Sequence, residues 1–250
     1  MASFSAYSDK YASVRMVRED GVLEMTLHTN GNSLRWGQDA HADLVNALLD
    51  VSRDRENLIV ILTGTGEEFS GPEIAANVPR AVPKLSTEAW AKLGWESKHL
   101  IMNMLDIDVP VICALNGPAL RHAELPILCD VVIASEDAAF QDSAHFAGGL
   151  IPGDGVHVIF PMVMGLNRAR YFLLTGRKIF AQEALAIGLI NEIVPKADVL
   201  KRAHELAQLF LQQPDINRRY TRMLITEMIR REMNGMLGFG LAAEGLGIVG

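Results

Sequence analysis

The sequence contains few cysteines and no long apolar run. Its two cysteines, Cys113 and Cys129, lie in apolar stretches and lack the spacing of a metal-binding motif. We therefore expect buried free thiols of a reducing compartment. No stretch approaches the ~18 consecutive apolar residues needed to span a membrane, and residues 1–15 contain no apolar core of a signal peptide. These absences predict a cytoplasmic protein.

Positive charge is also scarce. The chain has 23 Lys and Arg against 30 Asp and Glu, which gives a net charge of -7 and a pI of about 5.5. An acidic chain without a basic stripe is a poor match for nucleic acid or for an anionic membrane, so we expect neither as a partner. With 250 residues, 49% of them hydrophobic, the chain is long enough to bury a sizeable core.

Apolar runs alternate with helical patterns in the first half of the chain. Continuous apolar runs rich in β-branched residues, typical of strands covered on both faces, occupy 58–63, 109–115 and 130–134. Two further strands are expected at 13–16 and 22–28, on either side of a turn at 19–21. Helical patterns occupy 38–52, 87–105 and 123–128. This alternation predicts an α/β fold with a parallel sheet covered on both faces.

The C-terminal part is mostly helical, with long patterns at 196–213 and 216–248. The second pattern contains five glycines, each of which costs about 1 kcal/mol relative to alanine in a helix: Gly235, Gly238, Gly240, Gly245 and Gly247. Such a helix is expected to form only when it is packed, for example against another subunit. We expect a core at 1–195 followed by a helical subdomain at 196–250.

Five segments in a fixed order carry a resemblance to a known family. They are TGTGEEFSG at 63–71, NGPALRHAEL at 116–125, CDVVIAS at 129–135, IPGDG at 151–155 and LLTGRKIFAQEALAIGLINEIV at 173–194. Together they resemble the crotonase (enoyl-CoA hydratase/isomerase) superfamily over residues 14–250. The resemblance implies an α/β fold, a crotonase-like spiral of repeated ββα units with a C-terminal helical trimerisation region. It also implies a homotrimer or a dimer of trimers.

The departures from the family pattern concern its binding of CoA thioesters. Family members that use these substrates hold the thioester oxygen with two backbone N–H groups. At the first position Phe69 is followed by Ser70, Gly71 and Pro72, and proline has no N–H to donate. At the second position the usual glycine run is replaced by Arg121 and His122, and His145 stands in place of a family acid. We expect the CoA oxyanion hole to be absent.

These departures resemble a branch of the superfamily, the β-diketone hydrolases. The similar segments are SLRWGQDAH at 33–41, NGPALRHAELP at 116–126 and FQDSAHFAGGLIPGDGVHV at 140–158. The branch cleaves the carbon–carbon bond between two carbonyls with water, a retro-Claisen reaction. The resemblance implies a small diketone substrate, cyclic rather than linear, and neither a cofactor nor a metal ion. Carried over by position are catalytic His145, Asp154, His122, Glu244 and His41, and substrate-binding Trp36 and His122.

The reaction needs a base, donors for two oxygens and a proton source. We assign His145 as the base that activates water. Asp154 follows nine residues later across a stretch rich in glycine and proline, which can turn back so that the carboxylate fixes the imidazole tautomer. The alternative is a loop histidine beside an aspartate that caps the helix after Gly155.

His122 is expected to polarise the carbonyl that becomes the enolate. It lies just past the carboxyl end of the strand at 109–115, where ligands bind in open α/β sheets. Trp36 is the expected second donor through its indole N–H, which cannot accept a hydrogen bond. The alternative for Trp36 is an ordinary core aromatic.

Two further residues, Glu244 and His41, are expected to support the site. Glu244 is the only acid in 236–250, so it is either solvent-facing or buried with a raised pKa. His41 lies on the buried face of the helix at 38–52 and is the expected partner of Glu244, or else a core histidine. Nothing in their spacing distinguishes Asp142, Ser143 and His157 from solvent-facing residues, and Glu124 can be explained by the helix dipole.

The sequence is also compatible with alternative functions. The first is a CoA-thioester hydratase or isomerase of the same superfamily. A non-catalytic scaffold or RNA-binding module is disfavoured by the acidic charge, and a serine hydrolase by the lack of a G-x-S-x-G elbow. A metal hydrolase is not indicated by any HExxH motif, because the sequence contains none. A proline-containing loop at 75–86 is expected to border the site and to set the size of the pocket.

Overall fold

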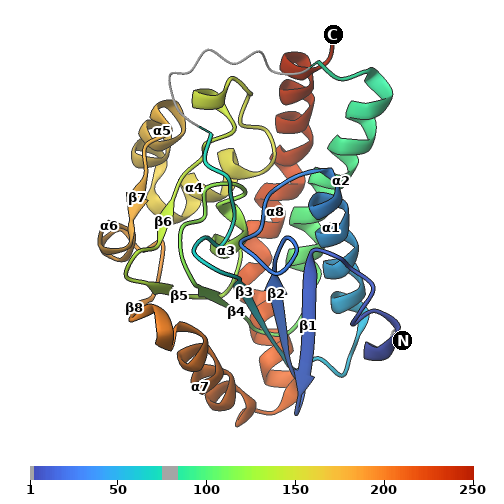
Figure 1. The fold of residues 1–250 in the computed structure, drawn as a ribbon, viewed down its shortest axis with the longest axis vertical. Helices are drawn as coiled ribbons and strands as arrows, with labels where there is room; N and C mark the ends of the chain where they lie inside the picture. The colour runs from blue at the N-terminus through green and yellow to red at the C-terminus, as the bar shows by residue number, and fades with distance from the viewer. Residues whose placement is uncertain (1–2, 75–83) are drawn as a thin grey trace.

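A six-stranded sheet forms the centre of the molecule (Figure 1). The computed structural model describes residues 3–74 and 84–250. The strands run in the order β1 (Val14–Glu19), β2 (Val22–Leu27), β3 (Ile59–Gly64), β4 (Val111–Leu115), β5 (Val131–Ser135) and β8 (Glu192–Val194). β1 and β2 are joined by the predicted turn and pair antiparallel, and all the remaining neighbours in this sheet pair parallel. The predicted α/β fold with its doubly covered sheet is confirmed.

Helices cover both faces of this sheet. Val60 and Leu62 of β3 join the large core that also contains the buried residues of α1 (Gln38–Arg53) and α2 (Thr87–Asp106). Ile59 and Ile61 point the other way, into a smaller core. There they meet α7 (Val199–Leu211), which packs against β3, β4 and β5. The alternation along β3 explains why its sequence is apolar at every position.

A smaller layer is built from segments that precede and follow β5 in the chain. It comprises α3 (Glu124–Ile127), α4 (Val156–Met164), α5 (Leu166–Thr175) and α6 (Ala181–Ala186), with a second sheet of β6 (Ala139–Phe140) and β7 (Ile179–Phe180). Within the part of the chain that the structure describes, short 3-10 turns are present at η1 (Phe4–Ala6), η2 (Phe146–Gly148) and η3 (Lys196–Asp198). Two-residue strands are too short to show a period, so sequence patterns did not predict the second sheet.

The last helix, α8 (Asp215–Ile248), is 34 residues long and packs against α2 and α4 (Figure 1). Two of its glycines are sites of close approach. A Cβ at Gly240 would lie 2.4 Å from the carbonyl oxygen of Gly153, and one at Gly245 would lie 2.4 Å from the indole nitrogen of Trp90. These contacts offset the low helix propensity of glycine, because they let α8 lie directly against the loop before α4 and against α2.

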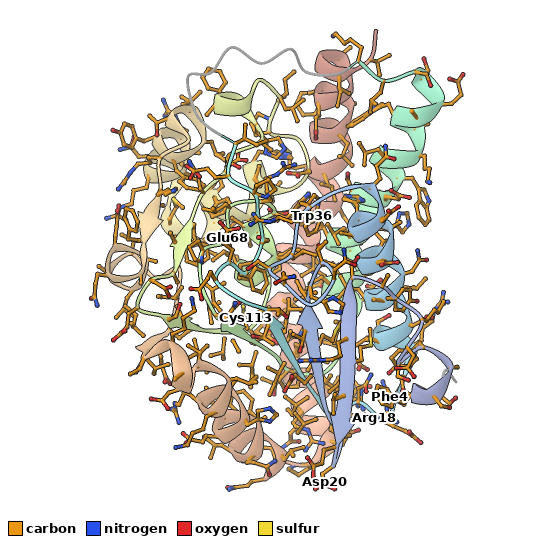
Figure 2. The ribbon with its side chains drawn as sticks, viewed as in Figure 1. Phe4, Arg18, Asp20, Trp36, Glu68 and Cys113 are labelled. Carbon is orange, nitrogen blue, oxygen red and sulfur yellow. The ribbon has the colours of Figure 1, made fainter. Side chains whose placement is uncertain are left out.

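Other expectations concern single segments. Cys113 and Cys129 are buried and free, as predicted, and Cys113 lies in the interior on β4 (Figure 2). No helix within the described residues is long and apolar enough to cross a membrane. The loop expected to border the site lies, from 75 to 83, outside the described residues. The division of the chain at 195 stays a prediction.

Candidate active site

A cavity of about 200 Å³ lies beyond the carboxyl ends of the parallel strands, bordered by α1, α2, α4 and α8. Its polar side chains come from loops and helices far apart in the sequence. Trp36, labelled in Figure 2, leads into α1 and contributes an aromatic wall. The cavity also has apolar walls, made by Leu93, Ala144, Leu150, Val156 and Ile248. This position, in the crevice past the strand ends, is where open α/β sheets bind ligands.

His145 is hydrogen-bonded to the carboxylate of Asp142, which is not one of the predicted site residues. Its Nδ1 lies 2.6 Å from Oδ1 of Asp142, and the same oxygen accepts the backbone N–H of His145 at 3.4 Å. Both side chains are buried. Asp142 therefore holds one end of the imidazole ring, and the other end, Nε2, faces the cavity.

Two further carboxylates lie at the Nε2 end of His145. Oδ2 of Asp154 is 3.4 Å away and Oε1 of Glu244 is 3.9 Å away. Glu244 reaches this point because Gly153 contacts α8 without a side chain, and a Cβ there would lie 2.2 Å from the carbonyl oxygen of Gly240. The predicted pair of His145 and Asp154 is thus brought together, with Glu244 beside it.

Mutual charges set the protonation of this cluster. Burial alone would lower the pKa of His145, but Asp154, Asp142 and Glu244 outweigh it and raise the pKa to about 10. Burial, reinforced by Asp154, raises the pKa of Glu244 to about 8. Burial also disfavours the charge of Asp154, yet His145 and His122 hold its pKa below the usual range. At neutral pH the cluster therefore contains an imidazolium, an ionised Asp154 and a protonated Glu244.

His122 has a carboxylate partner of its own. Its Nδ1 lies 2.6 Å from Oε1 of Glu124, which begins α3 and is fully buried, and 3.6 Å from Oδ2 of Asp154. The ring packs against Trp36 at a centroid distance of 4.0 Å. The backbone of His122 has a φ of +50°, unusual for a residue with a side chain, which turns the ring into the cavity. Asp154 thus lies between the two histidines.

His41 differs from the other two histidines. It is buried on α1, with its ring 5.7 Å from that of His122. Its Nδ1 is 3.4 Å from Oε2 of Glu96 on α2, but the two atoms are not hydrogen-bonded. Burial and the neighbouring His122 lower the pKa of His41 to about 3, so the ring is neutral. Among the described residues no ion pair joins His41 to Glu244, because α8 places Glu244 beside His145 instead.

Three carboxylates of the site were missed in the sequence. Asp142 and Glu124 lie three and two residues from their histidines, and Glu96 comes from a helix remote in sequence. The short spacings are visible in the sequence, but aspartate in a loop and glutamate at a helix start are usually explained without a partner. Burial separates the two cases, and burial is a tertiary property.

One group of side chains could in principle hold a metal ion. Ligand atoms of His122, Glu124 and Asp154 lie within 4.8 Å of one another. The contact between His122 and Glu124 already has the length of a charge-assisted hydrogen bond, so a ring N–H occupies the space between them. A metal ion would have to displace that proton, and the geometry is explained without it.

The backbone N–H groups of the three residues before Pro72 are engaged within the protein. The N–H groups of Phe69 and Ser70 donate to the carbonyl oxygen of Pro118, and that of Gly71 donates to Leu34. Pro72 has none to offer. The first of the two donors that a CoA oxyanion hole requires is therefore already engaged at these positions.

The chain matches relatives over most of its length. The family model for enoyl-CoA hydratase/isomerase matches residues 17–236. Over 236 residues the chain is 28% identical to a short-chain-enoyl-CoA hydratase of Clostridium acetobutylicum, covering 93% of this chain and 88% of the relative. Over 204 residues it is 31% identical to a putative enoyl-CoA hydratase of Thermus thermophilus, covering 80% and 78%.

A solved structure is more similar. It is that of a β-diketone hydrolase from the cyanobacterium Anabaena sp. PCC 7120, bound to (S)-3-oxocyclohexyl acetic acid. The two chains are 38% identical and superpose with a TM-score of 0.89, over 97% of this chain and 96% of the other. The expected crotonase fold with its long C-terminal helix is confirmed. The chain belongs to the enoyl-CoA hydratase/isomerase family of the crotonase superfamily.

Proposed function

We propose that this enzyme is a β-diketone hydrolase that cleaves the carbon–carbon bond of cyclic β-diketones by a retro-Claisen reaction. The observation that carries the proposal is the convergence of Asp154 and Glu244 on Nε2 of His145. Such a cluster provides a base and a proton donor for water without a covalent nucleophile. The similarity to the Anabaena β-diketone hydrolase supports the same reaction class.

In the proposed reaction His145 acts in its neutral form, which is the minor form at neutral pH because its pKa is raised to about 10. Water loses a proton to Nε2 as its oxygen attacks one carbonyl carbon of the diketone, and Asp154 stabilises the imidazolium that results. The tetrahedral oxyanion then collapses into a carboxylic acid. The electron pair of the broken carbon–carbon bond passes to the second carbonyl, which becomes an enolate.

The enolate oxygen is the second charge to be stabilised. His122 can stabilise this oxygen when both of its ring nitrogens carry a proton: Nδ1–H donates to Glu124 and Nε2–H donates to the enolate oxygen, with the indole N–H of Trp36 as the second donor. Glu244 is protonated at neutral pH and supplies the proton to the enolate carbon. The proton that His145 took from water then passes to Glu244, 3.9 Å away, so both groups are restored and the net change is one water consumed and one keto acid formed.

Pocket chemistry favours a small neutral substrate. The cavity of about 200 Å³ has apolar walls, which suit a ring of carbon atoms. Its buried polar groups include four carboxylates, Glu124, Asp142, Asp154 and Glu244. A substrate that already carries a negative charge would have to approach these groups, at an electrostatic cost. The occupied N–H groups at 69–71 likewise disfavour the alternative, a CoA-thioester hydratase or isomerase.

The first test is direct. The purified protein is incubated with a 2,2-disubstituted cyclic 1,3-diketone, with EDTA present and no CoA, and the ring-opened keto acid is sought. A crotonyl-CoA hydration assay runs in parallel. Keto acid formed by the wild type and lost in His145→Ala supports the proposal. Hydration of crotonyl-CoA with no diketone cleavage across several ring sizes would establish the alternative instead.

We also propose that the chain assembles as a homotrimer or a dimer of trimers through its C-terminal helical part. Many large apolar side chains of α8 are exposed in the single chain: Ile216, Tyr220, Met223, Leu224, Ile225, Met228, Met236, Phe239 and Leu246. Exposed apolar surface of this extent usually marks a contact with another protein. A second copy of this chain is the proposed partner.

A further inference from the structure

We propose that Asp142 is the residue that positions His145, holding its Nδ1 so that Nε2 meets water and substrate. The catalytic role of this contact rests on the proposed function, whereas the hydrogen bond between Asp142 and His145 is observed independently of it. Oδ1 of Asp142 accepts from both the ring and the backbone of His145. A carboxylate that accepts the Nδ1 proton leaves the lone pair of a neutral imidazole on Nε2.

The loop that carries Asp142 is anchored on both sides of it. The side chain of Gln141 donates to the carbonyl oxygen of Gly176 at 2.8 Å. The hydroxyl of Ser143 donates to the carbonyl oxygen of Leu120 at 2.6 Å. Because Leu120 precedes the His122 turn, the Ser143 bond joins the two histidine loops. Asp142 therefore has little freedom to follow a ring that rotates, and it can impose an orientation on His145.

Asp154 cannot perform this task in the observed geometry. Its Oδ2 lies 3.4 Å from Nε2 of His145, the same ring nitrogen that Glu244 approaches. From the sequence we expected Asp154 to fix the tautomer. The arrangement instead divides two tasks between two carboxylates: Asp142 orients the ring at Nδ1, whereas Asp154 lies at the nitrogen that exchanges the proton.

The inference is tested in the full-length chain with two substitutions. Asp142→Asn keeps the size of the side chain and an oxygen acceptor but removes the charge, and Asp142→Ala removes both. Asp137→Asn is the matched control, since Asp137 is a carboxylate bonded to Ser135 and Lys196 outside the cavity. Each protein is labelled with ¹⁵N-histidine, and His145→Asn identifies the two ring signals of His145.

The ring nitrogens are followed from about pH 6 to about pH 11, where neutral and charged imidazole are distinguished. The groups around His145 that titrate or carry charge are Asp142, Asp154, Glu244 and His157. In the wild type and in Asp137→Asn we expect Nδ1 to keep its proton while Nε2 loses one. In both Asp142 variants the titration moves to lower pH by about one unit or more, because one nearby negative charge is gone.

Diketone kinetics give the second measurement. Asp142→Ala is expected to lower kcat roughly 10²-fold with KM changed less than about threefold, since the ring is misoriented but the pocket is intact. Folded variants with an unshifted titration, or with raised KM and unchanged kcat, would overturn the inference. If the wild type cleaves no diketone, the proposed function is wrong, and the nitrogen titration alone decides whether Asp142 orients His145.

Discussion

At the scale of single residues, three histidines within one cavity have different environments. His145 contacts three carboxylates, and its pKa is raised to about 10. His41 has a carboxylate within 3.4 Å that does not bond it, and its pKa is lowered to about 3. The contrast follows from the balance between burial and nearby charge, because burial disfavours the imidazolium and only well-placed carboxylates reverse that. We therefore assign proton transfer to His145 and a supporting role to His41.

Replacing Asp154 tests the proposed dyad. Asp154→Asn keeps the shape of the side chain but removes the charge that stabilises the imidazolium of His145. We expect kcat for diketone cleavage to fall roughly 10²–10⁴-fold while the circular dichroism spectrum is unchanged. Asp137→Asn, at the surface, should leave kcat unaltered. A wild-type rate in Asp154→Asn would remove this carboxylate from the mechanism.

The pH dependence of kcat/KM follows from two groups. His145 must lose its proton to act as base, with a pKa of about 10, and Glu244 must keep its proton to act as donor, with a pKa of about 8. Activity should therefore rise about tenfold per pH unit up to about 8, stay level to about 10 and then fall.

Glu244→Gln provides the control for this profile. Glutamine cannot ionise, so the break near pH 8 should disappear, and the rate should be lower at every pH because the proton donor is lost. The measurement is kcat/KM across the range in wild type and variant. A wild-type optimum near neutrality, or an unchanged profile in the variant, contradicts the assignment of Glu244.

At the scale of elements, α8 shows how packing overrides local propensity. Its sequence contains glycines that disfavour a helix, yet the helix is continuous because it is packed along α2 and α4. Gly240 meets Gly153 and His157, whereas Gly238 has no atom within 4 Å of where a Cβ would lie. The close approach at Gly240 is also what carries Glu244 to His145.

Two substitutions on α8 separate packing from propensity. In Gly240→Ala the Cβ would lie 2.2 Å from the His157 ring, so we expect a loss of about 1–3 kcal/mol in the free energy of unfolding. In Gly238→Ala no described atom opposes the methyl group, and the helix should gain up to about 1 kcal/mol. Urea unfolding of the two proteins measures both. Equal changes in the free energy of unfolding would show that close packing is not the reason why position 240 is a glycine.

At the scale of the whole molecule, the single chain presents apolar side chains that a soluble monomer rarely exposes. Along α8, Leu224 is 75% exposed, Met228 71% and Phe239 72%. Burial of such residues between subunits would stabilise the assembly through the hydrophobic effect. The acidic net charge does not oppose this, because these positions on α8 are uncharged.

Light scattering coupled to size exclusion tests the assembly. Three copies of the 27.4-kDa chain would give about 82 kDa, and a dimer of trimers twice that. We expect Leu224→Arg to lower the measured mass, because a buried unpaired charge is costly. Leu174→Arg, at an exposed leucine on α5 outside the C-terminal helical part, is the matched control and should leave the mass unchanged. A monomeric wild type would contradict the proposal.

Local patterns in the sequence determined the main elements, whereas the resemblance to the β-diketone hydrolases supplied most of the expected site residues. The apolar run at 58–63 predicted β3, and the stripe on 38–52 predicted both α1 and the burial of His41. The position of His122 past a strand predicted its place in a crevice, and the glycines and proline after His145 predicted a turn that brings Asp154 back. These predictions succeed because each depends on neighbours within one or two elements.

Only the tertiary structure decided which carboxylate meets which nitrogen. Asp142 and Asp154 are both close enough to His145 in the sequence to contact its ring. The orientation of the ring places Nδ1 beside Asp142 and Nε2 beside Asp154. Glu244 is placed by α8, whose path depends on glycines that contact a loop some 87 residues earlier in the chain. Such contacts depend on how closely elements that are distant in the sequence pack together, and no periodicity in the sequence encodes them.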